Sequence, residues 1–362
     1  MNQPVMLRVD ICTGCQLHCP GCPTADGKVA ETLGTGRMSL EKFTQLLDDN
    51  PRIKHVEISN WGEIFLNKDL EKIVKLAFER GVKLRADNGV NLNHASPAVL
   101  EAMVRYGFAS MTCSIDGATP DIYKQYRVGG DLDQVLANIR LINELKKKHK
   151  SSLPRLTWQF VIFPHNGHEI KLARARAHEL GMGFFSIMSW DHLDIQTKEP
   201  AAEGGAPPAK KQRPQEKFKR PEINRNICAQ FWNDPQVNWD GRVLGCCVND
   251  WDDFGNAFDS GLQNVLKSER FTYAKEMLFG LKPARKDIPC TTCHFYQNMQ
   301  KTNQWMSKSF IARNAIYWRI LLALNINAKW AGGIYSRLRD SWYDFREKIT
   351  SSPPRGGEDE KT

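Results

Sequence analysis

Strand-like and helix-like segments alternate along the first half of this 362-residue chain, and no other feature limits the possible folds as much. Short runs rich in β-branched and aromatic residues are each followed by a longer segment with apolar residues at helical spacing. The strand-like runs are Leu7–Ile11, His55–Ser59, Val82–Asp87, Ser110–Ile115, Thr157–Phe163 and Phe184–Ser189. The helical segments are Leu40–Asp49, Asp69–Arg80, Pro97–Tyr106, Leu132–His149 and Glu169–Leu180.

This order predicts an α/β fold in which crossover helices join parallel strands. Gly81, Gly107 and Gly181 stand directly after three of the helical segments, where a left-handed residue ends a helix. Six strand–helix units predict an open, partial (β/α)6 TIM-like barrel over residues 1–193. A doubly wound open sheet remains the alternative, because the pattern alone does not separate the two.

Three cysteines follow the first strand at the spacing C-x₃-C-x₂-C: Cys15, Cys19 and Cys22. Three thiolates can hold three irons of a four-iron cluster, and the fourth iron then stays open to a small molecule. Zinc is the alternative, with His18 or Cys12 as the fourth ligand.

The chain has ten cysteines, and nine of them lie in two groups, at positions 12–22 and 228–293. The first residues lack an apolar core of signal-peptide length, which predicts a cytoplasmic protein. Cysteines grouped in a cytoplasmic chain indicate metal or redox chemistry rather than disulfides. In the second group, the turn sequence Trp239-Asp240-Gly241 predicts a β-hairpin whose second strand ends at the pair Cys246-Cys247.

Polar residues follow three further predicted strands. These residues are Gly62-Glu63 after the second, Asn88-Gly89 after the third, and Ser114 with Asp116 at the end of the fourth. Because the carboxyl ends of parallel strands meet at one edge, we expect these residues to face the cysteine loop.

These motifs resemble those of the radical S-adenosylmethionine (radical SAM) enzymes, whose signature has the spacing of the three cysteines. The stretch around Gly62-Glu63 is similar to their second motif, Gly-Gly-Glu-Pro, with Trp61 for the first glycine and Ile64 for the proline. Residues 114–130 look like the fourth-strand segment of members that carry a C-terminal cluster domain. The second cysteine group resembles the SPASM domain and its shorter "twitch" relative.

The resemblance implies a 4Fe-4S cluster on Cys15, Cys19 and Cys22, with S-adenosylmethionine on its open iron. Reductive cleavage then yields methionine and a 5′-deoxyadenosyl radical, which abstracts a hydrogen atom from the substrate. Gly62 and Glu63 take the ammonium of the cofactor. Asn88, Ser114 and Asp116 line the cofactor site, where Ser114 and Asp116 hydrogen-bond the ribose or order the loop around it. Arg127 reaches the cofactor carboxylate or merely caps the helix that follows it.

One auxiliary 4Fe-4S cluster is also implied, on Cys228, Cys246, Cys290 and Cys293, with Cys247 a close alternative to Cys246. A cluster with four thiolates serves as an electron acceptor or relay. Four thiolates could equally make a structural zinc site.

The remaining segments complete the predicted organisation. Residues 194–226 read as a basic linker rich in Pro, Gly and Ala, residues 227–300 as a small cysteine-rich α+β domain, and residues 301–346 as an amphipathic helical extension before a disordered tail, 347–362. The apolar stretch of the helical extension, Ala315–Leu324, is too short to span a membrane. Residues 305–346 could pack on the barrel, contact a protein partner or lie on a membrane surface; nucleic acid is not expected.

The leading hypothesis is an oxidoreductase that acts on a small polyol or sugar-like metabolite, or on a residue of a peptide. It needs an external one-electron reductant of the flavodoxin or ferredoxin kind, and the auxiliary cluster takes the second electron. A peptide maturase that forms a carbon–carbon or thioether link is the second enzyme hypothesis. The non-enzyme hypothesis is a zinc-stabilised scaffold or membrane-docking protein. No residue stands out as the acid–base partner of the substrate.

Overall fold

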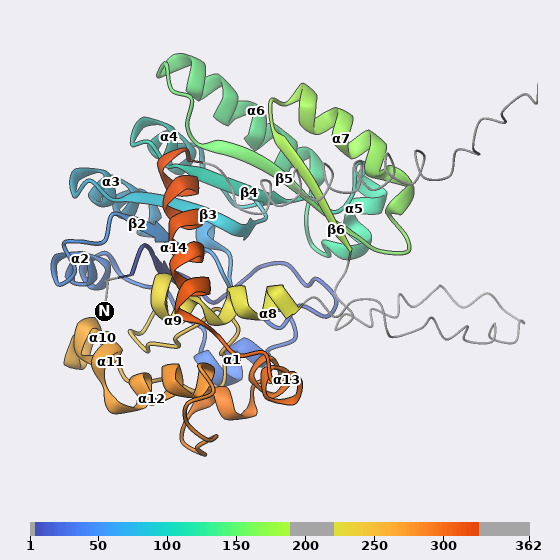
Figure 1. The fold of residues 1–362 in the computed structure, drawn as a ribbon. Coiled ribbons are helices and arrows are strands. Elements are labelled where there is room, and N and C mark those ends of the chain that lie inside the picture. Colours follow the sequence, from blue (N-terminus) through green and yellow to red (C-terminus); the bar gives the residue numbers. More distant parts are fainter. Residues whose placement is uncertain (1–3, 189–220, 326–362) are drawn as a thin grey trace, which may run out of the picture.

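One sheet of seven parallel strands organises the chain in a computed structural model that describes residues 4–188 and 221–325 (Figure 1). The strand order is β6-β5-β4-β3-β2-β1-β7. The strands are β1 Leu7–Val9, β2 His55–Glu57, β3 Lys83–Val90, β4 Ser110–Ser114, β5 Arg155–Ile162, β6 Gly183–Met188 and β7 Gln236–Val237. Most of the predicted linker, residues 326–346 and the predicted tail lie outside the described residues.

The crossover helices confirm the predicted α/β fold and the partial barrel. They are α2 Leu40–Asp48, α3 Leu70–Glu79, α4 Pro97–Arg105, α6 Leu132–Lys148 and α7 Ile170–Glu179. Gly81, Gly107 and Gly181 follow three of them with φ of 65°, 65° and 66°, as a left-handed stop requires. Two short helices, α1 Lys28–Leu33 and α5 Pro120–Tyr126, were not predicted.

The two faces of the sheet differ in chemistry. Leu7, Val56, Leu84 and Met111 lie in the apolar core that the sheet shares with the crossover helices. Alternate positions on the same strands, such as Arg8 and Arg85, are buried but charged. Because successive side chains of a strand point to opposite faces, one face of the sheet packs on helices and the other is polar.

The seventh strand comes from the second cysteine region, since β7 pairs in parallel with β1. A buried ion pair joins the same segments, with Arg8 Nε 2.6 Å from Asp234 Oδ2. Gln236 Nε2 also donates to Asp10 Oδ2 at 2.6 Å. The cysteine-rich region is therefore attached to the barrel edge through main chain and buried polar side chains.

Helices make up most of the region beyond residue 221. They are α8 Pro221–Cys228, α9 Gln230–Asn233, α10 Ala257–Ser260, α11 Leu262–Lys267, α12 Glu269–Leu278, the 3-10 turn η3 Pro289–Thr292, α13 His294–Thr302 and α14 Lys308–Ala323. Residues 221–226, assigned to the linker from sequence, are the first part of α8. The hairpin strand expected to end at Cys246-Cys247 is reduced to isolated antiparallel bridges, Val237–Val243 and Arg242–Asn256.

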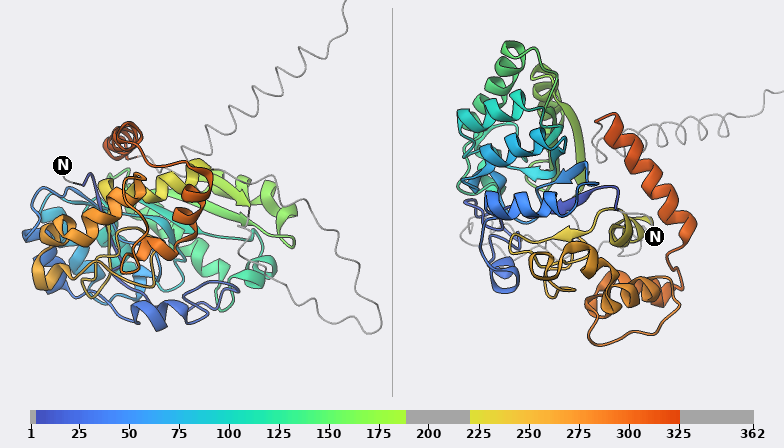
Figure 2. Two further views of the ribbon diagram at one scale, coloured as in Figure 1. Left: turned by 60° about the horizontal axis from the view of Figure 1, so that its bottom comes forward. Right: turned by 90° about the vertical axis from the view of Figure 1, so that its left-hand side faces the viewer.

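Helix α14 makes up most of the described part, residues 301–325, of the predicted helical extension. It stands on the side of the sheet away from α3, α4 and α6 (Figure 2, right), where Leu321 and Leu322 are buried. Ile316, Ile320 and Leu324 are exposed on its outer side. Within the described ranges, none of the helices combines the length and apolar character needed to cross a membrane.

We expect the substitution Asp234→Ala to lower the free energy of unfolding by about 3–5 kcal/mol, because it leaves the buried Arg8 guanidinium without its carboxylate. Chemical unfolding of the anaerobic protein would measure the loss. The control is Asp48→Ala, which removes an exposed ion pair with Arg80 and should hardly move the midpoint. Equal effects of the two substitutions would contradict a stabilising role for the buried pair.

Candidate functional site

The loop after β1 brings Cys15, Cys19 and Cys22 together, as predicted. Cys19 is buried in a small apolar cluster with Leu17 and Phe163, and Cys15 and Cys22 pack against that cluster at its edge. Burial raises the pKa of the Cys15 thiol to about 12, and the neighbouring charges of Cys19 and Cys22 act in the same direction. The three sulfur atoms are therefore close neighbours in a poorly solvated loop.

Hydrogen-bond donors surround two of these sulfurs. Leu17 N donates to Cys15 Sγ at 3.5 Å, and Asn91 Nδ2 donates to it at 3.7 Å. Arg127 Nη1 lies 3.8 Å from Cys19 Sγ, and its charge lowers the pKa of that thiol against the larger, opposing effect of burial. Metal binding requires thiolates, so amide donors and a cation at these sulfurs fit a metal cluster.

The loop after β2 touches the cysteine loop directly. A Cβ at Gly62 would lie 2.3 Å from Cys12 O and 2.7 Å from Gly14 O, so only glycine fits there. The next amide, Glu63 N, donates to Gly14 O at 2.8 Å. The predicted pair Gly62-Glu63 is thus in main-chain contact with the segment that leads into the cysteines.

The Glu63 carboxylate is buried and connects two strand ends. Its Oε1 accepts from Phe65 N at 3.2 Å and its Oε2 from Asn91 N at 2.6 Å. Burial raises the pKa of Glu63 to about 7, although these hydrogen bonds lower it. Contact of this carboxylate with a cofactor ammonium stays a prediction.

Asp116 and Arg127 form an ion pair at the end of β4. Asp116 Oδ2 accepts from Arg127 Nε at 2.7 Å and lies 2.6 Å from its Nη2, while Oδ1 accepts from Val161 N at 2.7 Å. Arg127 is also the C-terminal cap residue of α5. The predicted capping of the following helix by Arg127 is wrong, because Asp131 caps α6 and Arg127 instead ends α5. Cofactor contacts of Asp116 and Arg127 stay predictions.

Ser114 is the last residue of β4, and Asn88 lies within the neighbouring β3, two residues before its end. Ser114 is buried beside Gly89, whose φ is 139° and where a Cβ would lie 2.5 Å from Ser114 Oγ. Asn88 Nδ2 donates to Asn60 Oδ1 at 3.2 Å, and Asn60 Nδ2 donates to Cys247 O at 3.1 Å. The strand ends therefore connect the barrel site to the second cysteine group.

Sequence reasoning missed Asn60 and Asn91. Asn91 donates to Cys15 Sγ and accepts from Gln16 Nε2 at 2.8 Å. Strand β3 runs to Val90, beyond the predicted end at Asp87, so Asn91 rather than Asn88 is the first residue after it. A longer strand assignment could have identified Asn91.

Four cysteines of the second group lie near one another. Burial raises the pKa of Cys228, and the charges of Cys246, Cys290, Cys293 and Cys247 add to that effect. Cys247 has further neighbours on the barrel side: the Arg8 charge lowers its pKa against burial, and its amide donates to Gln230 Oε1 at 2.7 Å. Its thiol therefore interacts both with Arg8 on the barrel side and with Cys246, whose pKa it raises.

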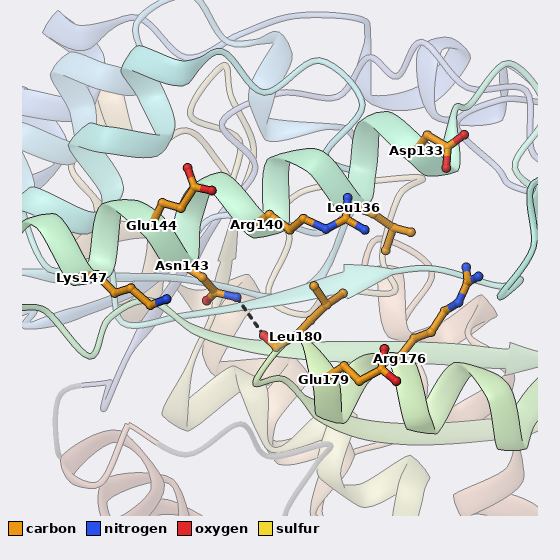
Figure 3. A pocket seen from close by; sticks show the side chains of 9 residues that line it. All are labelled: Asp133, Leu136, Arg140, Asn143, Glu144, Lys147, Arg176, Glu179 and Leu180. Atoms are coloured by element: carbon orange, nitrogen blue, oxygen red, sulfur yellow. Dashed lines mark hydrogen bonds between the residues drawn. The ribbon is translucent and has the colours of Figure 1, made fainter.

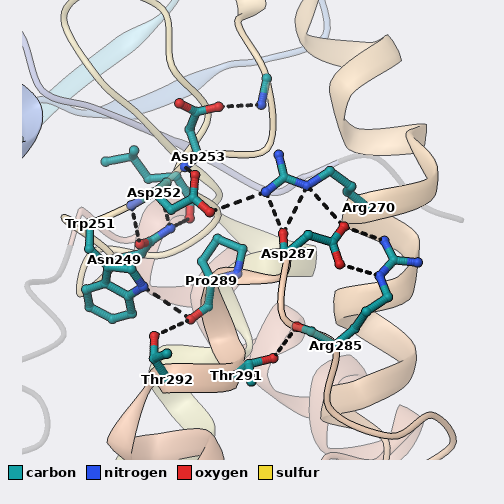
Figure 4. A network of polar contacts seen from close by, with 12 residues as sticks. Asn249, Trp251, Asp252, Asp253, Arg270, Arg285, Asp287, Pro289, Thr291 and Thr292 are labelled. Atoms are coloured by element: carbon teal, nitrogen blue, oxygen red, sulfur yellow. Dashed lines mark hydrogen bonds and ion pairs between the residues drawn. The ribbon is translucent and has the colours of Figure 1, made fainter.

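A polar network holds the segment before Cys290 (Figure 4). Arg270 Nη2 donates to Asp287 O at 2.6 Å, and Trp251 Nε1 donates to Pro289 O at 3.2 Å. Arg285 pairs with Asp287 at 2.7 Å and also with Glu269. These contacts connect the loop after Cys247 to the turn that carries Cys290, so they position cysteines that are far apart in sequence.

The two residues considered as a fourth zinc ligand for the first triad, Cys12 and His18, have different surroundings. The Cys12 thiol is buried and donates to Gly14 O at 3.5 Å, and His18 is exposed. Across residues 4–188 and 221–325, no group of three or more His, Cys, Asp or Glu side chains surrounds a single ion position. A four-iron cluster is bound differently, because each thiolate meets its own iron atom.

A cleft of about 610 Å³ lies elsewhere, on the outer surface between α6 and α7 (Figure 3). Acidic and basic side chains alternate along it, among them Glu144, Lys147 and Arg176, and Asn143 Nδ2 donates to Leu180 O across it. None of the predicted site residues lines this cleft, so it is separate from the cysteine site.

Comparison with known proteins agrees with this geometry. Residues 9–169 match the family model of the radical SAM superfamily, and residues 228–294 match that of SPASM, an iron–sulfur cluster-binding domain. Each model covers one of the two cysteine groups.

Two curated relatives match over part of the chain. An AdoMet-dependent heme synthase of Methanosarcina barkeri is 24% identical over 146 residues, 40% of this chain and 40% of the relative. A GTP 3′,8-cyclase of Alkaliphilus oremlandii is 29% identical over 137 residues, 37% of this chain and 41% of the relative. The matches thus span about two fifths of these relatives.

Among solved structures, Streptococcus suis SuiB bound to its precursor peptide SuiA superimposes with a TM-score of 0.55. The sequences are 12% identical, and the match covers 82% of this chain and 71% of that one. This likeness shows a shared fold.

Asp10 gives the site region a predicted pH dependence. Its carboxylate is buried at the end of β1, accepts from Trp61 N at 3.3 Å and from Gln236 Nε2, and has its pKa raised to about 7 by burial. The folded protein holds this proton to about pH 7, whereas an unfolded chain releases it near pH 4. Stability should therefore fall as the pH rises through that range.

We expect Asp10→Asn to cancel that fall, because the amide stays neutral and a rotated Gln236 side chain can accept from it. The free energy of unfolding should be similar for both proteins near pH 5. At pH 8 it should be higher for the variant by about 2–4 kcal/mol. Unfolding curves at several pH values would measure the difference. Parallel pH profiles would contradict the assignment.

Proposed function

Since this chain belongs to the radical SAM superfamily and carries a SPASM domain, we propose that Cys15, Cys19 and Cys22 hold a 4Fe-4S cluster with S-adenosylmethionine on its open iron. The observation that carries the proposal is the loop itself: three neighbouring thiols, two of them supplied with N–H donors, closed against Gly62-Glu63. When bound, this group supplies a one-electron cleavage that yields a 5′-deoxyadenosyl radical.

The protein's residues orient and shield that chemistry. Arg127 balances the negative charge of the thiolates, and Asp116 holds Arg127 in place. Glu63 and Asn91 connect the ends of β2 and β3 to the cysteine loop. We assign the cofactor contacts to Gly62, Glu63, Asn88 and Ser114, because these residues occupy the strand ends around the triad. The apolar cluster of Leu17, Cys19 and Phe163 keeps water away from one side of the cysteine triad.

The second group would hold one auxiliary 4Fe-4S cluster, on Cys228, Cys246, Cys290 and Cys293. Support comes from the mutual interaction of these thiols and from the Arg8 charge, which gives Cys247 a partner outside the group. A cluster with four protein ligands takes up or passes on an electron. The proposed reaction is therefore an oxidation, with hydrogen abstraction at the first site and electron removal through the second.

The substrate is a small polyol or sugar-like metabolite or a peptide residue, and a flavodoxin- or ferredoxin-like protein is the proposed reductant. Peptide maturation is the second candidate, favoured by the fold likeness to SuiB, whose structure was solved with a precursor peptide. The exposed stripe of Ile316, Ile320 and Leu324 on α14 is the surface we assign to a protein or membrane contact.

Replacing Cys15, Cys19 and Cys22 together by Ala tests the first cluster. The anaerobic wild-type protein should contain about eight irons per chain, and the triple variant about four, because the auxiliary thiols remain. The variant should form no 5′-deoxyadenosine from S-adenosylmethionine and dithionite. A colourless wild-type protein with zinc at full occupancy, or continued 5′-deoxyadenosine formation by the variant, would refute the proposal.

A matched pair of variants tests the auxiliary ligands. Cys246→Ser should lose about four irons per chain and the corresponding electron paramagnetic resonance signal. Cys247→Ser should keep both, because the proposal places Cys246 and not Cys247 among the ligands, and the Arg8 charge gives the Cys247 thiol a partner outside the cluster. The opposite pattern of iron contents would assign the ligand to Cys247.

A further inference from the structure

A row of buried polar side chains crosses the sheet on the face opposite the crossover helices. Arg8 of β1 is in register with Glu57 of β2, and Glu57 is in register with Arg85 of β3. Arg8 also matches Gln236 of β7, and Arg85 matches Ser110 of β4. Matched residues on adjacent strands lie about 4.8 Å apart, so the five positions form one continuous row. All five are at least nine-tenths buried.

Arg85, in the middle of this row, has an open hydrogen-bonding edge. Its exposed fraction is 0%, and Nη1 donates to Asp87 Oδ2 at 2.9 Å. Its Nε and Nη2 have no hydrogen-bond partner within the described part of the chain. These two N–H groups point the same way from the planar guanidinium, and together they are the fork that receives two oxygens of a carboxylate.

The neighbours of Arg85 add further unpaired atoms to the same place. Arg8 uses Nε for Asp234, but its Nη1 is unpaired, as is Gln236 Oε1, when residues 4–188 and 221–325 are considered. Unpaired buried polar groups each cost about 1–3 kcal/mol, so folded proteins rarely leave several together. Their concentration in one row indicates a polar ligand.

We infer that Arg85, assisted by Arg8, binds a carboxylate group of the substrate on the polar face of the barrel. The inference names the substrate class of the proposed enzyme and rests on that proposed function. The row lies below the strand ends: Arg85 precedes Asn88 by three residues, about 10 Å along an extended strand. A substrate anchored there extends toward the cysteine loop, where its reacting carbon is needed.

The surrounding charges favour a carboxylate over a phosphate. Asp87 is already paired with Arg85 Nη1 and Ser110 Oγ, and Asp234 with Arg8. Both carboxylate oxygens of Glu57 already accept hydrogen bonds, Oε1 from Ser59 Oγ and Oε2 from Asp87 N. Because Asp87 and Asp234 already offset the two guanidinium charges, a second negative charge on the ligand would be repelled, so a carboxylate with one charge fits better than a phosphate with two.

Fluorine NMR of trifluoroacetate with the anaerobic holoenzyme tests the site. We expect saturable line broadening that acetate reverses, whereas acetamide reverses it little and inorganic phosphate less than acetate. Arg85→Lys keeps the charge but loses the fork, so affinity should fall by about tenfold or more. The control is Arg155→Lys, in the same register row on β5 but exposed, which should bind as the wild type does.

Circular dichroism and iron content would show whether Arg85→Lys is folded; if it is not, Arg8→Lys tests the same site from β1. Unsaturable broadening, equal affinity of Arg85→Lys and wild type, or stronger competition by acetamide or phosphate would overturn the inference. Full iron content without trifluoroacetate binding removes this inference alone. Trifluoroacetate binding without iron removes the proposed function and leaves an anion site.

Discussion

The close approach of two loops is the constraint on which the site depends. The loop after β2 lies so near the cysteine loop that a Cβ at Gly62 would meet Cys12 O at 2.3 Å, and the next amide bonds to Gly14 O. Main-chain contact of this kind cannot relax as a long side chain can, because the strands on both sides hold the two loops. The position of Cys15 therefore follows from the pairing of β1 with β2, and Glu63 extends the connection to β3 through Asn91.

A second constraint is the placement of charge inside the sheet. Arg8, Glu57 and Arg85 occupy matched positions on three adjacent strands, where apolar residues would pack more simply. Buried charges need partners, and here the partners come from both regions: Asp87 from the barrel and Asp234 from the segment before β7. The cysteine-rich region thus completes the electrostatics of the barrel face as well as its sheet. This arrangement explains why the barrel and the cysteine-rich region form one continuous seven-stranded sheet rather than meet at a polar surface.

The fold was predictable from sequence where local signals agreed. Six strand-like runs, five helical segments and three stop glycines, all visible in the sequence, match β1–β6 and the crossover helices, because periodicity and turn chemistry act locally. The addition of β7 to the sheet was not predictable, since a two-residue strand has no periodicity and its partner β1 lies over 220 residues away. Similarly, the cysteine triad follows from spacing, whereas Asn60 and Asn91 act through contacts between loops that no local pattern reveals.

The departure from the Gly-Gly-Glu-Pro motif has a structural reason in these contacts. Trp61, in place of the first glycine, packs against a cluster formed by Val29 and Leu33 of α1 and by Leu244. Helix α1 follows the cysteine triad, and Leu244 precedes Cys246 by two residues. Its neighbour Asn60 donates to Cys247 O. One loop therefore contacts both cysteine groups, so a displacement of either group is resisted by the other. A glycine at position 61 would leave a gap in that cluster, so Trp61 fills the space between α1 and the segment that leads to Cys246.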